Sequence, residues 1–430
     1  MHRTTSLKTL SAVIAAAALA ACGGGGGGDS STSGTTTPTT PTTPTTPTTP
    51  TSKFTQSATW TFTLPAAGQS VCYDFDAKAE VAGCTGTAWD VKLVSGGRSA
   101  SLYTNSGPSG SGAGAAFGSP FTHTWTNLLT WNDALTDPTG GAVPAAAYTA
   151  DTAKSAFTGS NDIQSAAFEY DLTGTHQLSP NFRVFLVTTN SASADITGTS
   201  NKVYAVQLTS YYGGATGTTS GWPSFRWVDT ASSGNVLSDS VDATAGWVYY
   251  DLSAKAKTTE SGNWQIAFNR YNVKLNGGTS GSGTVAGYLS KTPAGFYGAD
   301  GKPVVAKFGS TSNLNDTLAD LTGAQTGPAT ASAWVKDSIG SQLSPDYTGT
   351  YPAALNYGWY TYYPSATAAA AVGLGEHQLK ANPDAATLVK SGEGKSYARM
   401  HLASISYAAA TLAYSGAQTW TIEFGVQPAN

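Results

Sequence analysis

Short runs in which apolar and polar residues alternate recur from about residue 55 to the end of the chain. Alternation with a period of two is typical of a strand that buries one face, and these runs are rich in β-branched and aromatic residues. Examples are ATWTFTLPA, KVYAVQLTSYY, GWVYYDL, NWQIAFNRYNVKL and TWTIEFGVQ. Helical periodicity is scarce, and short helices are expected only within 127–136 and 312–339. The pattern therefore predicts a mostly β fold of antiparallel sheets with few short helices.

The strand-like runs repeat in a fixed order. VCYDFD, AWDVKL and YTNSGPSGSGAG follow one another in the first half of the chain, and VYYDLS, NWQIAF and KLNGGTSGSGTVAG do so in the second. The segments after them also correspond, since each contains His-Gln-Leu ahead of a strand-like run, at 176–178 and 377–379. Repetition in a fixed order indicates duplicated units. We therefore expect two tandem all-β domains, 55–235 and 240–430, joined by the Ser/Gly/Asp-rich stretch 231–246.

The glycine-rich turn NGGTSGSG at 276–283 raises phosphate binding as an alternative. A P-loop requires Gly-x-x-x-x-Gly-Lys-Ser/Thr between a strand and a helix, and the chain contains no such sequence. A dinucleotide-binding fingerprint requires a βαβ context, whereas this turn leads into more strand-like residues. Asn276, Gly277 and Gly278 suit a turn with positive φ that packs closely on a neighbouring strand. We therefore interpret the stretch as a structural turn.

The N-terminus carries the features of a bacterial export signal. Basic residues come first, and an apolar stretch too short to span a bilayer follows at 9–21. This stretch ends in Leu-Ala-Ala-Cys, which matches a lipobox. Residues 1–21 are therefore predicted to be a signal peptide, and Cys22 is predicted to be the lipidated first residue of the mature chain. Cleavage nearby without lipidation is the alternative.

Residues 22–54 have the composition of a tether. Six glycines follow the cysteine, and Thr-Pro repeats come after them. Such repeats cannot build a core and favour an extended polyproline II chain, which would span roughly 50 Å or more. Glycine directly after the cysteine resembles lipoproteins that are exported onward to the outer membrane. We expect an outer-membrane lipoprotein of a Gram-negative bacterium, held by its lipid anchor and facing the cell surface or the periplasm.

Charge and cysteine content narrow the class of protein further. The net charge is −4 and charged residues make up 11% of the chain, so no basic face indicates nucleic-acid binding. After lipidation only Cys72 and Cys84 remain, and both lie in the exported part of the chain. A disulfide between them is expected, with two free thiols as the alternative. A metal site at these cysteines would need further ligands, and none occur nearby in the sequence.

The run WVYYDL and the later run WQIAFNRYNVKLNGGTSGSGTVAG carry a family resemblance. Together they resemble the strand, Trp-centred strand and glycine turn of the HmuY family, which are hemophore-like lipoproteins of Gram-negative bacteria. The matching positions are Trp247, Tyr249, Trp264, Ala267, Phe268, Tyr271, Val273, Lys274, Asn276, Gly278, Ser280, Gly281 and Gly283. Gln265 stands where the family has Asp, whereas the first repeat keeps this residue as Asp90. The family tail resembles FRVFLV with NKVYAVQLTSYY, and also GKSYARMHLASISY, so the resemblance covers most of both expected domains.

The resemblance implies an all-β fold that binds heme at the cell surface or periplasmic face. It also implies a TonB-dependent outer-membrane receptor as the partner. The best-known members hold the heme iron with two histidines, and others use methionines. The places that correspond to one ligand read Phe168–Leu172 and Trp359–Pro364, and neither contains His or Met. The other ligand would fall earlier in each repeat, again where the sequence has neither residue, so the family's ligand residues are not retained.

Other histidines are candidate ligands, because heme iron takes an axial His, Met, Cys or Tyr beside an apolar wall. His176 and His377 occupy matching places in the two repeats, each at the entry to a strand-like run. Duplication alone would also produce this correspondence. His123 lies among aromatic residues in the run PFTHTWTN. Structural or solvent-exposed roles are the alternative for all three.

Four further residues complete the set of candidate ligands. Met400 and His401 are adjacent on one predicted strand, so their side chains would point to opposite faces and cannot serve one site. Tyr362 and Tyr363 lie near the strand that carries a family ligand, and a tyrosine oxygen can hold heme iron. Core packing is the alternative for each of these side chains.

The sequence offers no catalytic constellation, and we do not expect an enzyme. It contains no Gly-x-Ser-x-Gly elbow and no His-Glu-x-x-His motif, and its only close acidic groupings are Asp74 with Asp76 and Glu376 beside His377. We therefore expect a lipoprotein that binds heme or a related tetrapyrrole for TonB-dependent uptake. The alternatives are an accessory lipoprotein of an outer-membrane transporter that binds a non-heme ligand or a partner, and a surface adhesin on the Thr-Pro tether.

Overall fold

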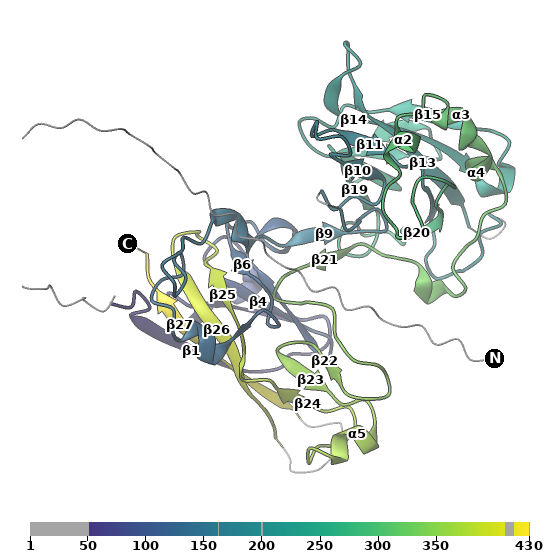
Figure 1. The fold of residues 1–430 in the computed structure, drawn as a ribbon. Helices are drawn as coiled ribbons and strands as arrows, with labels where there is room; N and C mark the ends of the chain where they lie inside the picture. Colours follow the sequence, from purple (N-terminus) through teal and green to yellow (C-terminus); the bar gives the residue numbers. More distant parts are fainter. Residues whose placement is uncertain (1–50, 162, 199–200, 409–416, 430) are drawn as a thin grey trace, which may run out of the picture. The chain divides into compact units, whose positions relative to one another are not determined.

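The structure is a computed structural model that describes residues 51–161, 163–198, 201–408 and 417–429 (Figure 1). Within these residues the chain is mostly β, its strands pair antiparallel and its helices are short, which confirms the expected fold class. The expected signal peptide, the lipidated Cys22 and most of the tether lie outside the described residues.

Strands from the two ends of the described chain form three sheets, and we term these strands together the outer strand group. Its strands are β1 (Gln56–Thr63), β2 (Ser70–Asp74), β3 (Ala79–Glu80), β4 (Val91–Ser95), β5 (Ala100–Thr104), β6 (Ala115–Phe117), β7 (His123–Thr124), β8 (Tyr148–Thr149), β22 (Leu355–Asn356), β23 (Tyr360–Tyr362), β24 (Leu379–Ala381), β25 (Ala385–Lys390), β26 (Tyr397–Tyr407) and β27 (Gln418–Gln427). The largest sheet has the order β1-β27-β26-β25-β6-β8, with β7 also paired to β25. The other two have the orders β3-β2-β4-β5 and β22-β23-β24.

The middle of the chain forms three further sheets, which we term the inner strand group. Its strands are β10 (Phe168–Tyr170), β11 (Leu178–Pro180), β12 (Val184–Thr188), β13 (Val203–Gly213), β14 (Thr219–Asp229), β15 (Leu237–Ser240), β16 (Val248–Asp251), β17 (Ala256–Thr258), β18 (Ile266–Asn269), β19 (Asn272–Leu275) and β20 (Ala286–Lys291). The orders are β15-β14-β13-β12-β20, β17-β16-β18-β19 and β10-β11. Two short strands, β9 (Thr152–Lys154) and β21 (Ser338–Gly340), pair only with each other and connect the groups along the chain (Figure 1).

Helices in the described residues are single turns between strands. They are α1 (Trp125–Leu128), α2 (Val305–Phe308), α3 (Asn313–Asp316), α4 (Leu318–Thr322) and α5 (Ala366–Ala370), with 3₁₀ turns η1 (Ala82–Cys84), η2 (Gly107–Ser109), η3 (Ala145–Ala147), η4 (Thr230–Ser232) and η5 (Ala331–Ala333). Helix α1 overlaps the first stretch where a helix was expected, and α3 and α4 lie in the second. The Thr124 side chain caps α1 by accepting the backbone N–H of Asn127 at 3.1 Å.

Alternating side chains place the core between the sheets of each group. On β1, Ala58, Trp60 and Phe62 are buried while the threonines between them are exposed. The Trp60 ring stacks on Tyr73 with ring centroids 5.2 Å apart. Full burial of one side chain such as Phe62 stabilises the fold by about 1.5–3 kcal/mol. The period-two pattern therefore places apolar side chains in the core and polar ones in solvent.

Strand pairing crosses the boundary expected between residues 55–235 and 240–430. Strand β1 pairs along its whole length with β27, which lies at the far end of the chain. In the inner group, β12 pairs with β20, although these strands lie on opposite sides of the expected junction 231–246. The alternation pattern fixes which face of a strand is buried, but it does not specify the partner strand. The largest sheet of each group therefore combines strands from both repeats.

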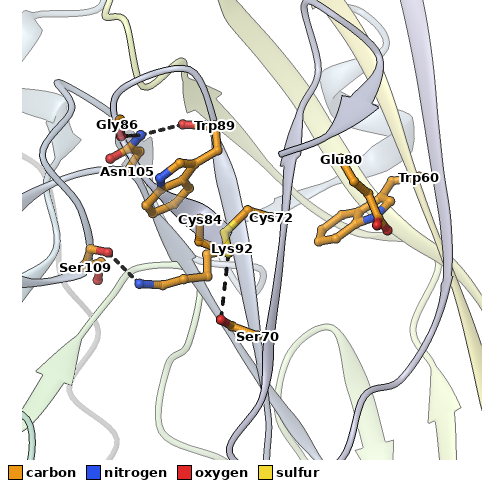
Figure 2. Close-up of a disulfide and its surroundings, with 10 residues drawn as sticks. All are labelled: Trp60, Ser70, Cys72, Glu80, Cys84, Gly86, Trp89, Lys92, Asn105 and Ser109. Carbon is orange, nitrogen blue, oxygen red and sulfur yellow. Dashed lines mark hydrogen bonds between the residues drawn. A yellow bond between two sulfur atoms is a disulfide. The ribbon is translucent and has the colours of Figure 1, made fainter. Parts of the chain in front are cut away.

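The expected disulfide is present. Cys72 on β2 and Cys84 at the end of η1 are joined, with their Cα atoms 5.4 Å apart. Figure 2 shows this bond beside the side chain of Lys92, whose ammonium lies 5.1 Å from the ring centroid of Trp89. The amide of Asn105 donates a 2.7 Å hydrogen bond to the Trp89 carbonyl (Figure 2). The disulfide and this amide together fix the loop that leads into β4.

The glycine-rich turn at 276–283 makes protein contacts throughout. Gly278 has φ +63°, and a Cβ there would collide with the backbone carbonyl of Asp337. The Asn276 amide donates a 3.0 Å hydrogen bond to the carbonyl of Trp264, as Asn105 does to Trp89 in the outer group. Glycine is needed at this close approach, because other residues adopt positive φ at a cost and would bring a Cβ into the carbonyl. The geometry agrees with the interpretation as a structural turn.

Candidate functional site

Two residues that the sequence named separately, Tyr362 and His377, meet in the β23–β24 hairpin. Their Oη and Nδ1 atoms lie 2.8 Å apart, and their rings are nearly parallel at an interplanar angle of 14°. Tyr362 pairs with Leu379 across the hairpin, so His377 comes just before the second strand. The backbone N–H of His377 donates to the carbonyl of Tyr363 at 2.7 Å, with φ +65° at the histidine. This backbone geometry holds the imidazole against the phenol.

The imidazole of His377 is accessible at the surface of the hairpin. Its side chain is 30% exposed, and its Nε2 atom lies 3.8 Å from a carboxylate oxygen of Glu376. The contact at Nδ1 fixes the orientation of the ring, and in the tautomer in which Nδ1 donates to the Tyr362 oxygen, Nε2 carries the lone pair that can bind a metal. The pair therefore presents one oriented imidazole and one phenol on the same face.

Three tyrosines with neighbouring rings lie in the same region, and we term Tyr347, Tyr357 and Tyr360 the tyrosine row; the rings of Tyr357 and Tyr360 are stacked, and that of Tyr347 is tilted by 44° against Tyr357. The ring centroids of Tyr347 and Tyr357 are 5.2 Å apart, as are those of Tyr357 and Tyr360. Tyr357 and Tyr362 both pack against the core of the outer group, and burial, with charge repulsion from Tyr347 and Tyr362, raises the pKa of the Tyr357 phenol. Tyr347 is 51% exposed, so the row runs from the solvent into the core.

The row borders a small cavity in the outer group. The cavity has a volume of about 210 Å³ and is walled by Leu343, Trp359 and the tyrosine row. Buried Tyr360 donates a 3.0 Å hydrogen bond to the carbonyl of Ala100, which fixes the inner end of the row. The cavity is smaller than the roughly 300–1,000 Å³ of a pocket that encloses a drug-sized ligand, so it would take only one edge of a larger flat ligand.

The inner group repeats the tyrosine–histidine contact at the β10–β11 hairpin. The Tyr170 hydroxyl lies 3.0 Å from Nδ1 of His176, and this histidine also has a positive φ, at +55°. The backbone N–H of His176 donates to the carboxylate of Asp171 at 2.7 Å, and its side chain is 76% exposed. The matching histidines of the two repeats therefore occupy equivalent hairpin positions and contact equivalent tyrosines, although their backbone N–H groups have different acceptors.

The other two histidines lie in packed surroundings. The ring of His123 stacks on Phe117 with centroids 5.1 Å apart, and its buried Nε2 has no hydrogen-bond partner among the described residues. Burial lowers the pKa of His123, so its imidazole is neutral near pH 7. His401 lies 2.7 Å from the Pro383 carbonyl through Nδ1 and 3.2 Å from Glu423 through Nε2. Neither ring offers an exposed nitrogen without rearrangement.

Met400 and Tyr363 belong to the interior. Met400 on β26 is fully buried in the core of the outer group, on the opposite face of the strand from His401. Tyr363 is 8% exposed, and burial raises the pKa of its phenol. An iron ligand must reach the surface of a cleft, so these side chains do not form a site in this fold.

The acidic grouping noted in the sequence gains a third member in the structure. Carboxylate oxygens of Asp74, Asp76 and Asp90 lie within 4.8 Å of one another. The buried Asp90 accepts the backbone N–H groups of Phe75 and Gly392, both at 2.8 Å. Both of its oxygens therefore have protein partners, and the grouping holds backbone segments together.

The sequence analysis missed the tyrosine row. A signal for it was present, because six tyrosines fall between residues 346 and 363. A cluster of this density near a predicted strand indicates a binding surface rather than a core, since Tyr keeps a polar end that requires water or a partner. The contact between Tyr362 and His377 needed the register of the hairpin, which the pattern alone does not specify.

Among the described residues, no helix is both long and apolar enough to cross a membrane. Two comparisons with known proteins bear on identity. No curated protein matches the chain. Residues 243–420 match the model of the HmuY family, described as HmuY protein, and this region includes the tyrosine row and the hairpin with His377. Residues 243–420 are therefore HmuY-like.

Proposed function

We propose that this protein binds heme or a related tetrapyrrole, with the Tyr362–His377 pair and the tyrosine row as the binding face. The observation that carries this proposal is the oriented imidazole of His377, which lies within the HmuY-like region on the hairpin of β23. The strand Tyr360–Tyr362 is the one near which the resemblance places an axial ligand. A histidine at the end of the same hairpin can take over that role from a different position.

The residues of the face have distinct parts in this proposal. Nδ1 of His377 donates to the Tyr362 oxygen in the tautomer that leaves Nε2 as the ligating atom, and Glu376 moves aside from its position 3.8 Å away. The exposed ring of Tyr347 and the half-buried ring of Tyr357 would supply aromatic surface beside a flat macrocycle. Bound heme would supply an iron that accepts one axial nitrogen or oxygen ligand from the protein.

The wider role follows from the predicted lipid anchor. A lipoprotein on a Thr-Pro tether would hold the binding face away from the membrane surface, within reach of an outer-membrane receptor. We therefore propose that the protein is an accessory lipoprotein that captures its ligand and hands it to a TonB-dependent receptor. The support for this step is the lipobox and tether in the sequence together with the HmuY-like region.

The proposal is tested by titrating the exported chain, made with Cys22→Ser to omit the lipid, with hemin. A shifted Soret band and quenched tryptophan fluorescence are expected. His377→Ala should remove the axial-ligand features of the spectrum, and Tyr362→Phe should weaken binding by about 10- to 100-fold, as loss of an orienting partner does. His176→Ala, at the equivalent and more exposed position, is the matched control. An unchanged spectrum for His377→Ala would contradict the assigned ligand, and no Soret shift at micromolar hemin would contradict heme binding itself.

Exposed tyrosines favour a second candidate function on the same face. Tyr351 is 70% exposed and Tyr347 is 51% exposed, which also suits contact with a glycan or a partner protein. In that case Tyr347→Ala would abolish capture of the partner while hemin leaves the spectrum unchanged. The accessory and adhesin alternatives from the sequence would then apply.

A further inference from the structure

The two repeats contain equivalent segments, but the sheets combine them in crossed order. Each repeat has a lead segment, residues 56–151 or 237–337, and a tail segment, residues 155–229 or 341–427. Along the chain the order is first lead, first tail, second lead, second tail. In the outer group the first lead pairs with the second tail, through β1–β27 and β6–β25. In the inner group the second lead pairs with the first tail, through β15–β14 and β20–β12.

The two groups have the same strand order when equivalent strands are compared. The outer order β1-β27-β26-β25-β6 corresponds to the inner order β15-β14-β13-β12-β20, and β3-β2-β4-β5 corresponds to β17-β16-β18-β19. The hairpins β23–β24 and β10–β11 correspond as well, each with its tyrosine–histidine contact. Each group therefore contains one lead and one tail of the duplicated unit, taken from different repeats.

The two connections from lead to tail are equivalent at their first residue. Asp151 accepts the backbone N–H of Thr104 at 3.0 Å, and Asp337 accepts that of Leu275 at 2.8 Å. Thr104 and Leu275 are the last residues of β5 and β19, which are equivalent strands of the two leads. Each buried aspartate therefore attaches the end of a lead to that lead's own sheet.

The connections are also equivalent at their last residue. The Ser155 hydroxyl accepts the backbone N–H of Phe157 at 3.1 Å, and the Ser341 hydroxyl accepts that of Leu343 at 3.1 Å. Phe157 and Leu343 then enter the cores of opposite groups. Between Asp and Ser each connection has three residues, which are β9 and β21, and these two strands pair antiparallel with each other (Figure 1).

We propose that each strand group is one complete HmuY-like fold, and that the two repeats build these folds by exchanging tails across the β9–β21 ribbon. A duplicated chain can close each repeat on itself or cross over, because equivalent strands are available for pairing in both arrangements. Exchange of identical elements between protomers is a low-cost route to dimers, and exchange of equivalent elements between repeats follows the same logic. In the crossed form the two connections between the folds lie side by side. The β9–β21 pairing adds backbone hydrogen bonds between them.

The exchange has a consequence for the HmuY-like region. Residues 243–420 run from the second lead into the second tail, so the matched residues contribute half of each strand group. Neither fold can then form from one repeat. The binding face on β23–β24 is completed by the first lead, although that lead lies outside the matched region.

Paired cysteines on exposed strands distinguish the two arrangements. Thr61 and Thr421 face each other across β1–β27, with Oγ atoms 3.3 Å apart. Ser224 is the inner-group equivalent of Thr421, because each pairs with the edge strand and with the serine after a bulge in the neighbouring strand. The exchanged form predicts that Thr61→Cys with Thr421→Cys forms a disulfide within one chain. The matched control, Thr61→Cys with Ser224→Cys, would join only if the first repeat closed on itself.

The experiment uses the exported chain with Cys22→Ser, mild oxidation and peptide mapping under non-reducing conditions. We expect near-complete linkage of Thr61→Cys to Thr421→Cys in a monomeric chain and free thiols in the control. Linkage in the control, in both pairs, in neither pair, or only between two chains would each overturn the proposal. The pair Ser224→Cys with Ser240→Cys, which face each other across β14–β15, gives an independent second readout if a variant of the first pair fails to fold.

Discussion

Asp90 provides a direct test of how buried polar contacts stabilise the outer strand group. Its side chain is 1% exposed, and its two oxygens accept the backbone N–H groups of Phe75 and Gly392, each at 2.8 Å. Burial raises the pKa of Asp90 to about 8, although these two hydrogen bonds lower the pKa in part. The carboxyl joins segments that lie at opposite ends of the described chain.

The direction of the pH dependence follows from the pKa of Asp90 in the folded chain and in the unfolded chain. The ordinary pKa of the group is 3.8, so between about pH 4 and pH 8 the folded chain binds a proton that the unfolded chain has released. The free energy of unfolding must then fall as pH rises through this window, by at most about 1.4 kcal/mol per pH unit for one proton. The stabilisation is fully present below pH 4 and is lost by about pH 8. Asp90→Asn removes the contribution of this carboxyl to the change of unfolding free energy with pH.

The asparagine variant also carries a cost that does not depend on pH. An amide has one acceptor oxygen, so one of the two buried N–H groups loses its partner, which costs about 1–3 kcal/mol. Gln265, the inner-group equivalent, accepts only one N–H through its side chain, that of Leu252 at 2.8 Å. The substituted outer group would therefore keep one of its two contacts, as the inner group already does.

The measurement is urea unfolding of the wild type and of Asp90→Asn at pH 5, 6, 7 and 8, with the exposed Asp300→Asn as control. The difference in unfolding free energy between wild type and Asp90→Asn should be largest at pH 5 and shrink as pH rises. Other buried carboxyls are common to both proteins and cancel in this difference. A difference that stays constant from pH 5 to pH 8, or that grows with pH, would refute the assigned proton affinity.

Three further outcomes are expected from unfolding measurements. Replacing Cys72 and Cys84 together by Ala should lower the free energy of unfolding by about 3 kcal/mol, because their bond closes a loop with a sequence separation of 12; no change would contradict a stabilising cross-link. Gly278→Ala should lower the melting temperature more than Gly295→Ala, since both have positive φ but only the first Cβ would strike a backbone carbonyl; equal shifts would contradict this. His123→Phe should leave stability unchanged or raise it by about 1 kcal/mol, because it removes a buried nitrogen without a partner in the described residues, whereas a clear loss would show that the ring makes a needed hydrogen bond.

Local structure was predictable from the sequence because the signals were local. The alternation on β1 specified that Trp60 and Phe62 face the core, and the predicted export signal with two remaining cysteines indicated the disulfide between Cys72 and Cys84. The partner of β1 was not predictable, because a period-two pattern is satisfied by pairing with any strand of matching register. In a duplicated chain, two equivalent partners compete for each edge, and the sequence pattern is the same for both.

The candidate site was also predictable in its local features but not in the contacts between its residues. Equivalent positions in the repeats indicated His176 and His377, and alternation indicated that Met400 and His401 point apart, which the structure shows as a buried sulfur and an imidazole on the other face. The contact of His377 with Tyr362 depends on the register of a hairpin and on a positive φ at the histidine. Neither quantity is encoded in composition or spacing, since His adopts this backbone conformation only when its neighbours impose it.

The tyrosine row depends on residues far away in the sequence. The Tyr360 hydroxyl donates to the carbonyl of Ala100, and the Ser344 hydroxyl both donates to the Leu102 carbonyl and accepts the Leu102 N–H, at 2.9 and 2.7 Å. Ala100 and Leu102 lie on β5, which is part of the first lead and outside the HmuY-like region of residues 243–420. The inner end of the row is therefore anchored on the other repeat. A fragment limited to the HmuY-like region would contain every residue of the row but not the strand that orients it, so the proposed binding face requires both repeats of the chain.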